Sequence, residues 1–215
     1  MHEHPVAAIL RDAAAGVPPP VDGKVEVFPQ PPGPVAGILA FAGHHVVAAD
    51  VEPAWVHERL ADWDLNAPLA AAFVGELGRE LGVLPDNLDL VLAGRGAGAG
   101  PGPLVPTDGD HPRIERAHHY RREVRAWATA DGAGLLVLGR GLCGRWEAAF
   151  EVDESARGRG LGRGLVRAAL DVTPAGEPVF LQVAPGNVPS VRAVLGAGGF
   201  RPIGGELLFA VGEPT

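Results

Sequence analysis

The chain has 215 residues, of which 47% are hydrophobic and 20% are charged, and its formal charge at pH 7 is −8. This balance is typical of a globular protein with one compact domain or two small lobes, and the negative charge argues against a nucleic-acid partner. The sequence contains neither a run of ~20 apolar residues nor the basic and apolar regions of a signal peptide. We therefore expect no membrane partner and a cytoplasmic location.

The chain begins with a segment that we expect to be poorly packed. Residues 1–34 are predicted to be a leader, because positions 16–34 are rich in proline and glycine. Two paired strands are predicted after it, over residues 35–41 and 45–51, on either side of Gly43.

Two helices and a strand are predicted next. The first helix begins near Pro53, and the second extends from Asn66 as its N-cap to Gly82 as its terminator. Their apolar faces are expected to hold Val56, Leu60 and Trp63 in the first helix and Leu69, Phe73, Leu77 and Leu81 in the second. A strand is predicted at 87–92.

A glycine-rich stretch at 94–103 is predicted to be a linker or a mobile loop. Residues 35–108 are therefore expected to form an N-terminal lobe. This lobe is either the opening half of one fold or a separate, degenerate lobe.

Residues 109–215 are predicted to form a second region. A short helix is capped by Asp110 and begins at Pro112. Strands at 122–129 and 134–138 are expected to pair around Asp131-Gly132, which is a strong hairpin signal. A further strand at 145–152 leads into a turn.

The segment 151–170 is predicted to run as a strand, a glycine-rich turn and a helix. The first N–H groups of a helix lack intrahelical partners, and the helix dipole makes this end electropositive. Glycines let a phosphate approach the backbone closely. The pattern therefore predicts a site for a phosphorylated cofactor.

Two other glycine motifs offer alternatives to this interpretation. The Gly-Lys-Ser/Thr ending of a nucleotide-hydrolase phosphate loop is absent from the sequence. A G-x-G-x-x-G pattern occurs at 139–144, but the strand-like run 145–152 follows it where a dinucleotide site requires a helix. We interpret this second motif as a turn between strands.

The remaining motif, Arg157-x-x-Gly160-x-Gly162, is followed by a short apolar strand at 179–184, then by Asn187 at a helix start, then by Gly199-Phe200. In this order the signals resemble the GCN5-related N-acetyltransferases, the GNAT family, over roughly residues 113–211. The resemblance implies an α/β (α+β) fold, with a mixed, mostly antiparallel sheet flanked by helices and an extended or degenerate N-terminal lobe.

The resemblance also implies a function. It predicts direct transfer of an acyl group from acetyl-CoA to the amine of a small molecule, with residues 109–215 as the acetyl-CoA-binding core. A homodimer is left open. The residues that it assigns to acetyl-CoA are Glu151, Val152, Arg157, Gly158, Arg159, Gly160, Leu161, Gly162, Arg163, Asn187 and Ser190.

Two features of this set have alternative interpretations. Arg159, Arg163 and Arg167 are spaced four apart, so they form either a solvated helix face or a row that meets the phosphates. Asn187 contacts the CoA arm in the family, but it could also serve only as an N-cap.

The resemblance implies that the catalytic base is a glutamate on the strand before the loop. Alternation places Glu147 and Glu151 on one face of this strand. Glu147, several residues before the loop, is the position that the resemblance favours, and apolar neighbours would raise its proton affinity. The alternative is a salt bridge from Glu147 to Arg125 or Arg145.

The general acid has no assigned residue. The family's tyrosine position is Val194 in this chain, and Tyr120, the only tyrosine, is expected to lie in the core. Metal is not expected, because Cys143 is the only cysteine and adjacent histidines, as at 44–45, point to opposite faces of a strand.

Three functions are therefore compared. The first is an acetyl-CoA-dependent N-acetyltransferase that acts on a small amine. The second, favoured by the missing tyrosine, is a non-catalytic acyl-CoA-binding module or regulator. The third is a nucleotide-binding oxidoreductase, which depends only on the motif at 139–144.

Overall fold

The computed structural model describes residues 3–212, and the chain forms two compact units. One unit comprises Met1–Leu90 with Ile203–Thr215, and the other comprises Val91–Pro202. Two strands, β4 (Pro85–Arg95) and β10 (Phe200–Ala210), begin in one unit and end in the other.

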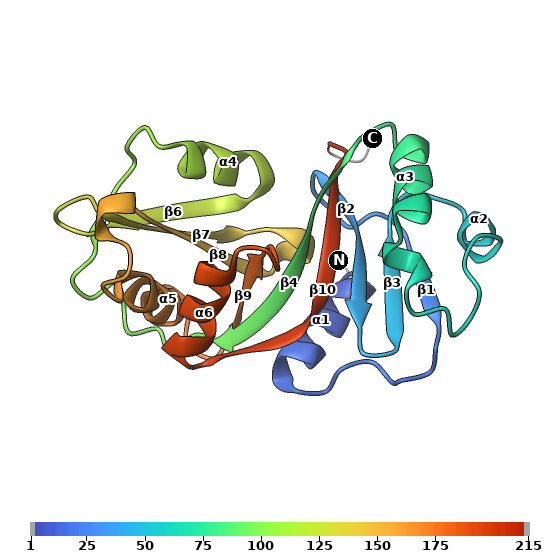
Figure 1. The fold of residues 1–215 in the computed structure, drawn as a ribbon, viewed down its shortest axis with the longest axis horizontal. Helices are drawn as coiled ribbons and strands as arrows, with labels where there is room; N and C mark the ends of the chain where they lie inside the picture. The colour runs from blue at the N-terminus through green and yellow to red at the C-terminus, as the bar shows by residue number, and fades with distance from the viewer. Residues whose placement is uncertain (1–2, 213–215) are drawn as a thin grey trace. The chain divides into compact units, whose positions relative to one another are not determined.

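The first unit is built on a short mixed sheet (Figure 1). Its strands lie in the order β1-β3-β2-β10. The β1–β3 pair is parallel, and the β3–β2 and β2–β10 pairs are antiparallel. The elements confined to this unit are α1 (Pro5–Ala15), β1 (Val25–Phe28), β2 (Val35–Phe41), β3 (His44–Ala48), α2 (Pro53–His57), the 3-10 helix η1 (Ala67–Leu69) and α3 (Ala71–Glu80).

The paired strands at 35–41 and 45–51 are confirmed, with Gly43 in a left-handed conformation at their turn. The second predicted helix is found as α3, which buries Phe73 and Leu77. The side chain of Asn66 makes no cap, because a 3-10 turn at 67–69 precedes the α-helix.

Two expectations for this unit were wrong. The predicted leader contains a helix, α1, whose N-terminus is capped by His4 and whose C-terminus ends at the left-handed Gly16. It also contains β1, which pairs with β3. The helix at Pro53 ends at His57, and Trp63 is 62% exposed instead of packing on its apolar face.

The second unit is a mostly antiparallel sheet flanked by helices, as predicted. Its strands lie in the order β4-β9-β8-β7-β6-β5. The β5–β6, β6–β7 and β7–β8 pairs are antiparallel, and the β8–β9 pair is parallel. The elements confined to this unit are β5 (Val105–Pro106), α4 (Pro112–Tyr120), β6 (Arg122–Ala128), β7 (Gly134–Arg140), η2 (Leu142–Gly144), β8 (Trp146–Val152), η3 (Glu154–Ala156), α5 (Leu161–Val172), β9 (Pro178–Val183) and α6 (Val188–Ala197).

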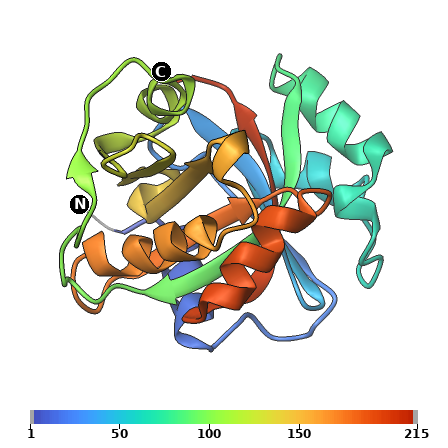
Figure 2. The same cartoon turned by 60° about the vertical axis from the view of Figure 1, so that its left-hand side comes forward.

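The helices cover opposite faces of this sheet (Figure 1). α4 packs Ile114 and Ala117 on one face, against Ala126, Leu135 and Val137 of β6 and β7. The other face carries α5, and α6 lies beside α5 (Figure 2). The two faces of β8 therefore meet different surroundings.

The cap of α4 differs from the prediction. His111, not Asp110, is the N-cap residue, and its Nδ1 accepts from the N–H of Arg113 at 3.1 Å. Pro112 occupies the first helical position as expected. An imidazole nitrogen thus replaces the expected carboxylate.

The glycine-rich stretch at 94–103, predicted to be a linker or a mobile loop, is hydrogen-bonded to the end of α5. The N–H groups of Ala97, Gly98 and Gly100 donate to carbonyls of Leu170, Thr173 and Asp171, at the end of α5. The last carbonyls of a helix lack intrahelical partners, and this stretch supplies them. A Cβ on Gly96 would lie 2.3 Å from the carbonyl oxygen of Pro174, so the close approach requires glycine there.

Candidate functional site

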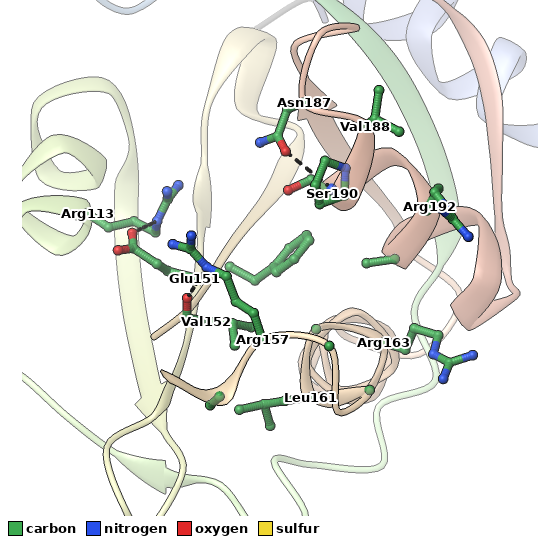
Figure 3. Close-up of a pocket in the computed structure, with 17 residues that line it drawn as sticks. Arg113, Glu151, Val152, Arg157, Leu161, Arg163, Asn187, Val188, Ser190 and Arg192 are labelled. Carbon is green, nitrogen blue, oxygen red and sulfur yellow. Dashed lines mark hydrogen bonds and ion pairs between the residues drawn. The ribbon is translucent and has the colours of Figure 1, made fainter. Parts of the chain in front are cut away.

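A cavity of about 820 Å³ lies entirely within the second unit, at the N-termini of α5 and α6 and the open end of β8 (Figure 3). Backbone from β8, from the turn after it and from both helices surrounds it. Its lining residues are Arg113, Phe150, Glu151, Val152, Ala156, Arg157, Gly158, Gly160, Leu161, Gly162, Arg163, Asn187, Val188, Pro189, Ser190, Arg192 and Ala193.

Strands β8 and β9 separate beside this cavity. Their parallel ladder contains three pairs and ends at Ala148 with Leu181. Trp146 to Ala148 are buried, whereas Ala149 to Val152 are partly exposed. The backbone edge of β8 from residue 149 onward is therefore free of the ladder with β9, and an extended ligand can use its N–H and C=O groups.

The turn after β8 presents backbone N–H groups to the cavity. Gly158 and Gly160 have left-handed backbone conformations, with φ of 77° and 86°. Residues other than glycine rarely adopt this conformation. The first helical bond of α5 runs from Arg163 N–H to the carbonyl of Gly160. The N–H groups of Leu161 and Gly162 precede it and lie at the positive end of the helix dipole.

The side chains around the cavity carry a positive surplus. Arg113, Arg157, Arg163 and Arg192 line it together with one carboxylate, Glu151. Figure 3 shows these groups arranged around the N-terminus of α5. This charge is opposite to the net charge of the chain, and it suits a ligand with several phosphate groups.

Glu147 lies outside this cavity lining, in a buried cluster of ion pairs. Its Oε2 lies 2.8 Å from Nε of Arg121, and its Oε1 lies 2.8 Å from Nε of Arg145. The backbone N–H of Leu142 also donates to Oε1, at 3.2 Å. The side chain is fully engaged within the fold.

The general-base assignment of Glu147 is therefore corrected. Burial alone raises the pKa of this carboxyl, but the charges and hydrogen bonds of Arg145 and Arg121 outweigh burial and hold the pKa at about 2. The expectation of a raised proton affinity was wrong, because arginines and not only apolar groups surround the carboxylate. The alternative partner Arg145 is found, and Arg121 takes the place that was expected for Arg125.

Glu151 remains at the cavity. Its Oε2 accepts from Nε of Arg113 on α4 at 2.8 Å, and its side chain is 42% exposed. A dashed line between Arg113 and Glu151 in Figure 3 marks this pair. Of the two β8 carboxylates, it is the one that a bound substrate can reach.

The three arginines spaced along α5 have separate environments. Arg163 lines the cavity, whereas Arg159 is exposed and does not line it. Nε of Arg167 donates to the carbonyl of Ala197 at 2.9 Å, which ties α5 to the end of α6. Of these three arginines, only Arg163 lines the cavity.

The start of α6 brings Asn187 and Ser190 to the cavity. Oδ1 of Asn187 accepts from the N–H of Ser190 at 3.2 Å, so this side chain is an N-cap. Because Asn187 both caps α6 and lines the cavity, both interpretations of this residue are compatible with the geometry.

Several residues that line the cavity were not predicted from the sequence. Arg113 comes from α4, 38 positions before its partner Glu151, and only the fold brings them together. Phe150 was assigned to the apolar face of β8 without a site role, although that face meets α5 and the cavity. Arg192 and Ala193 lie one turn into α6, and their position relative to Asn187 could have indicated them.

The other motifs are also placed by the structure. Residues 142–144 form a 3-10 turn between β7 and β8, as predicted, and no helix follows the pattern at 139–144. Gly141 is needed because a Cβ there would lie 2.2 Å from the carboxyl carbon of Glu147. The glycine pattern thus accommodates an ion pair, and the oxidoreductase hypothesis loses its basis.

Val194 is fully buried in α6, and Tyr120 is not among the cavity residues. The ring of Tyr120 packs edge-on against His119 and beneath the guanidinium of Arg116. Within residues 3–212 no group of three or more His, Cys, Asp or Glu side chains is placed to hold a metal ion, and no helix there is long and apolar enough to cross a membrane.

Part of the chain matches the sequence model of a known family. Residues 114–196 match the sequence model of the Acetyltransferase (GNAT) family. Among solved structures, the chain is similar to a GCN5-related N-acetyltransferase from Kribbella flavida, with 16% identity over 86% of this chain and 88% of that one and a TM-score of 0.42. It is also similar to a putative GNAT acetyltransferase from Novosphingobium aromaticivorans, with 17% identity and a TM-score of 0.42. This match covers 60% of this chain and 66% of that one, so the chain spans just under two thirds of the length of that protein. No curated protein matches the chain.

Proposed function

We propose that the chain transfers the acyl group of acetyl-CoA directly to an amine of a small molecule, since residues 114–196 match the sequence model of the Acetyltransferase (GNAT) family. The observation that carries this proposal is the junction of one cationic cavity with the gap between β8 and β9. A phosphate site and an extended backbone groove meet there.

The residues present suit acetyl-CoA. The diphosphate would be held by the N–H groups of Gly160 to Gly162, with Arg157 and Arg163 beside them. Arg192 lies in the same lining and would meet a further phosphate. The arm would then run along β8 from Val152 toward Ala148, a distance of ~13 Å at the rise of a strand.

The end of the gap defines the place of reaction. The strands rejoin at Ala148 and Leu181, so the thioester would lie close to Ala149 and Phe150. The N–H groups of this part of β8 are outside the ladder with β9, and one of them can donate to the thioester oxygen as charge develops on it.

Acetyl-CoA supplies an activated acyl group, and the reaction joins that acyl carbon to the amine nitrogen while the carbon–sulfur bond breaks. The amine must lose a proton. We assign this proton to Glu151, because it is the β8 carboxylate at the cavity. The departing thiolate would be protonated by solvent, since Val194 offers no acid.

The experiment is a thiol-release assay with acetyl-CoA and a panel of primary amines, together with a calorimetric titration of acetyl-CoA alone. We expect binding in both the presence and the absence of amine, and CoA release only with an accepted amine. Absence of acetyl-CoA binding would overturn the proposal.

A non-catalytic acyl-CoA-binding module is the second candidate. Two observations favour it: Glu147 is locked in ion pairs, and the family's tyrosine position is a buried valine. Tight acetyl-CoA binding with no release across the amine panel would select this candidate.

A further inference from the structure

The face of β8 and β9 opposite α5 carries three polar side chains. Glu147 is in register with Phe180, so these two residues share a face. Because strand side chains alternate, Glu151 of β8 and Gln182 of β9 lie on that same face. The guanidinium of Arg145, which binds Glu147, also lies 5.0 Å from the ring of Phe180, in agreement with this arrangement.

Two of these three side chains are already engaged. Glu147 is held by two arginines, and Glu151 is paired with Arg113. Gln182 differs from both. Its side-chain Nε2 is buried and has no hydrogen-bond partner among residues 3–212.

Gln182 also has a distinctive position along the chain. It directly follows Leu181, the last residue of the β8–β9 ladder, and it is partly exposed between the buried Leu181 and Val183. If the ladder continued, its partner would be Ala149. The amide therefore lies at the point where the strands separate, across from a residue with almost no side chain.

A buried amide donor without a partner is unfavourable for the fold, and buried polar groups nearly always have a partner. Met, Leu or Val at this position would fill the same space at no such cost. The presence of an unsatisfied amide at the proposed place of reaction therefore points to a partner that arrives with the substrate.

We infer that Gln182 binds the acyl acceptor, by donating a hydrogen bond to an oxygen that lies close to the acceptor's nucleophilic nitrogen. This inference rests on the proposed function. CoA would occupy the cavity on the α5 side, so the amine approaches from the other face, toward which Gln182 points. The acceptors it selects carry a hydroxyl, carbonyl or amide oxygen next to the amine.

The test uses Gln182→Met, which keeps the length and volume of the side chain but removes both polar atoms. The probes are a matched pair of amines, ethanolamine against propylamine, in which a hydroxyl replaces the terminal methyl group, with acetyl-CoA as donor. For the wild-type protein we expect kcat/KM to favour the oxygen-bearing amine by about tenfold or more. In Gln182→Met this preference should fall to about twofold or less.

Two readouts separate a binding role from a structural one. The KM for acetyl-CoA should stay unchanged in Gln182→Met, and its Tm should be equal to or above that of the wild-type protein, because an unsatisfied donor has been removed. A matched control is Val183→Ile, a neighbouring buried position on the other face of β9, which should keep the preference between amines.

Several outcomes would overturn the inference. An unchanged preference in Gln182→Met, or a wild-type protein that turns over amines without regard to the oxygen, would remove Gln182 from the acceptor site while leaving the transferase proposal in place. A lower Tm in Gln182→Met would show a structural role instead. Absence of acetyl-CoA binding or of any transfer by the wild-type protein would overturn both proposals together.

Discussion

The two ends of β8 differ, although the same strand carries both. At the closed end, residues 146–148 pair with β7 and β9 and are buried, and the carboxylate of Glu147 is surrounded by arginines. At the open end, residues 149–152 keep the pairing with β7 but leave β9, and Glu151 reaches the cavity.

One face of β8 therefore carries both a buried ion-pair cluster, at Glu147, and a carboxylate at the cavity, Glu151. Glu147 and Glu151 have the same residue type, the same strand and the same face, yet only the second lines the cavity. The deciding factor is the end of the ladder with β9, because this is where burial stops. Residue type and alternation alone could not distinguish the two carboxylates.

The largest expected effect is the loss of the buried ion pairs. Glu147→Gln should lower the free energy of unfolding by about 3–5 kcal/mol, because Arg121 and Arg145 would remain buried without their counter-charge. Chemical denaturation monitored by Trp fluorescence measures this. The matched variant Glu151→Gln should lose no more than about 1 kcal/mol, since its pair is partly exposed. Equal losses in both variants would contradict the distinction between the two ends.

The same pair predicts an acid-dependent loss of stability. The pKa of Glu147 falls from an ordinary 4.5 to about 2 in the folded chain. Its contribution, about 3 kcal/mol, is therefore fully present above pH 4.5 and is lost as the pH falls toward 2. Unfolding free energies measured between pH 6 and pH 2 should converge for the wild-type protein and Glu147→Gln. A constant difference over this range would refute the assignment.

At the open end, Glu151→Gln should reduce kcat by about 100-fold if this carboxylate accepts the amine's proton. The binding of acetyl-CoA should change little. The pH dependence of the remaining activity decides the role: the loss should be smallest at high pH, where the amine is already deprotonated. A kcat within twofold of wild type at pH 7 would assign Glu151 to the ion pair with Arg113 alone.

The smallest of these effects concerns the arginines of α5. Arg163→Ala should weaken acetyl-CoA binding by about tenfold, because it removes a cationic side chain from the cavity. Arg159→Ala is the matched control, four positions earlier and outside the lining, and should weaken it by less than about twofold. Calorimetry at low salt measures both. Equal effects would mean that the cluster acts only through its long-range field.

The sequence was sufficient to predict the strand–turn–helix at 151–170, because its glycines have specific conformational roles. Gly160 is the left-handed N-cap residue of α5, and Asn187 caps α6. These are local signals. The hairpin at Asp131-Gly132 was predictable for the same reason.

The predictions from the sequence were wrong where contacts between residues far apart in the chain determine the structure. Arg121 binds Glu147 although the two residues are 26 positions apart, and no local sequence pattern indicates this ion pair. The stretch at 94–103 has the composition of a linker but serves as the partner of the α5 C-terminus. Gly94, Gly96 and Gly98 lie close against neighbouring groups, and composition alone cannot distinguish such contacts from a linker.

The most direct test of the central claim is a crystal structure of the chain with acetyl-CoA. We expect the diphosphate to lie within hydrogen-bond distance of the N–H groups of Gly160 to Gly162, and the thioester to lie between β8 and β9 near Ala149. A diphosphate bound elsewhere, or strands β8 and β9 closed around no ligand at saturating acetyl-CoA, would contradict it.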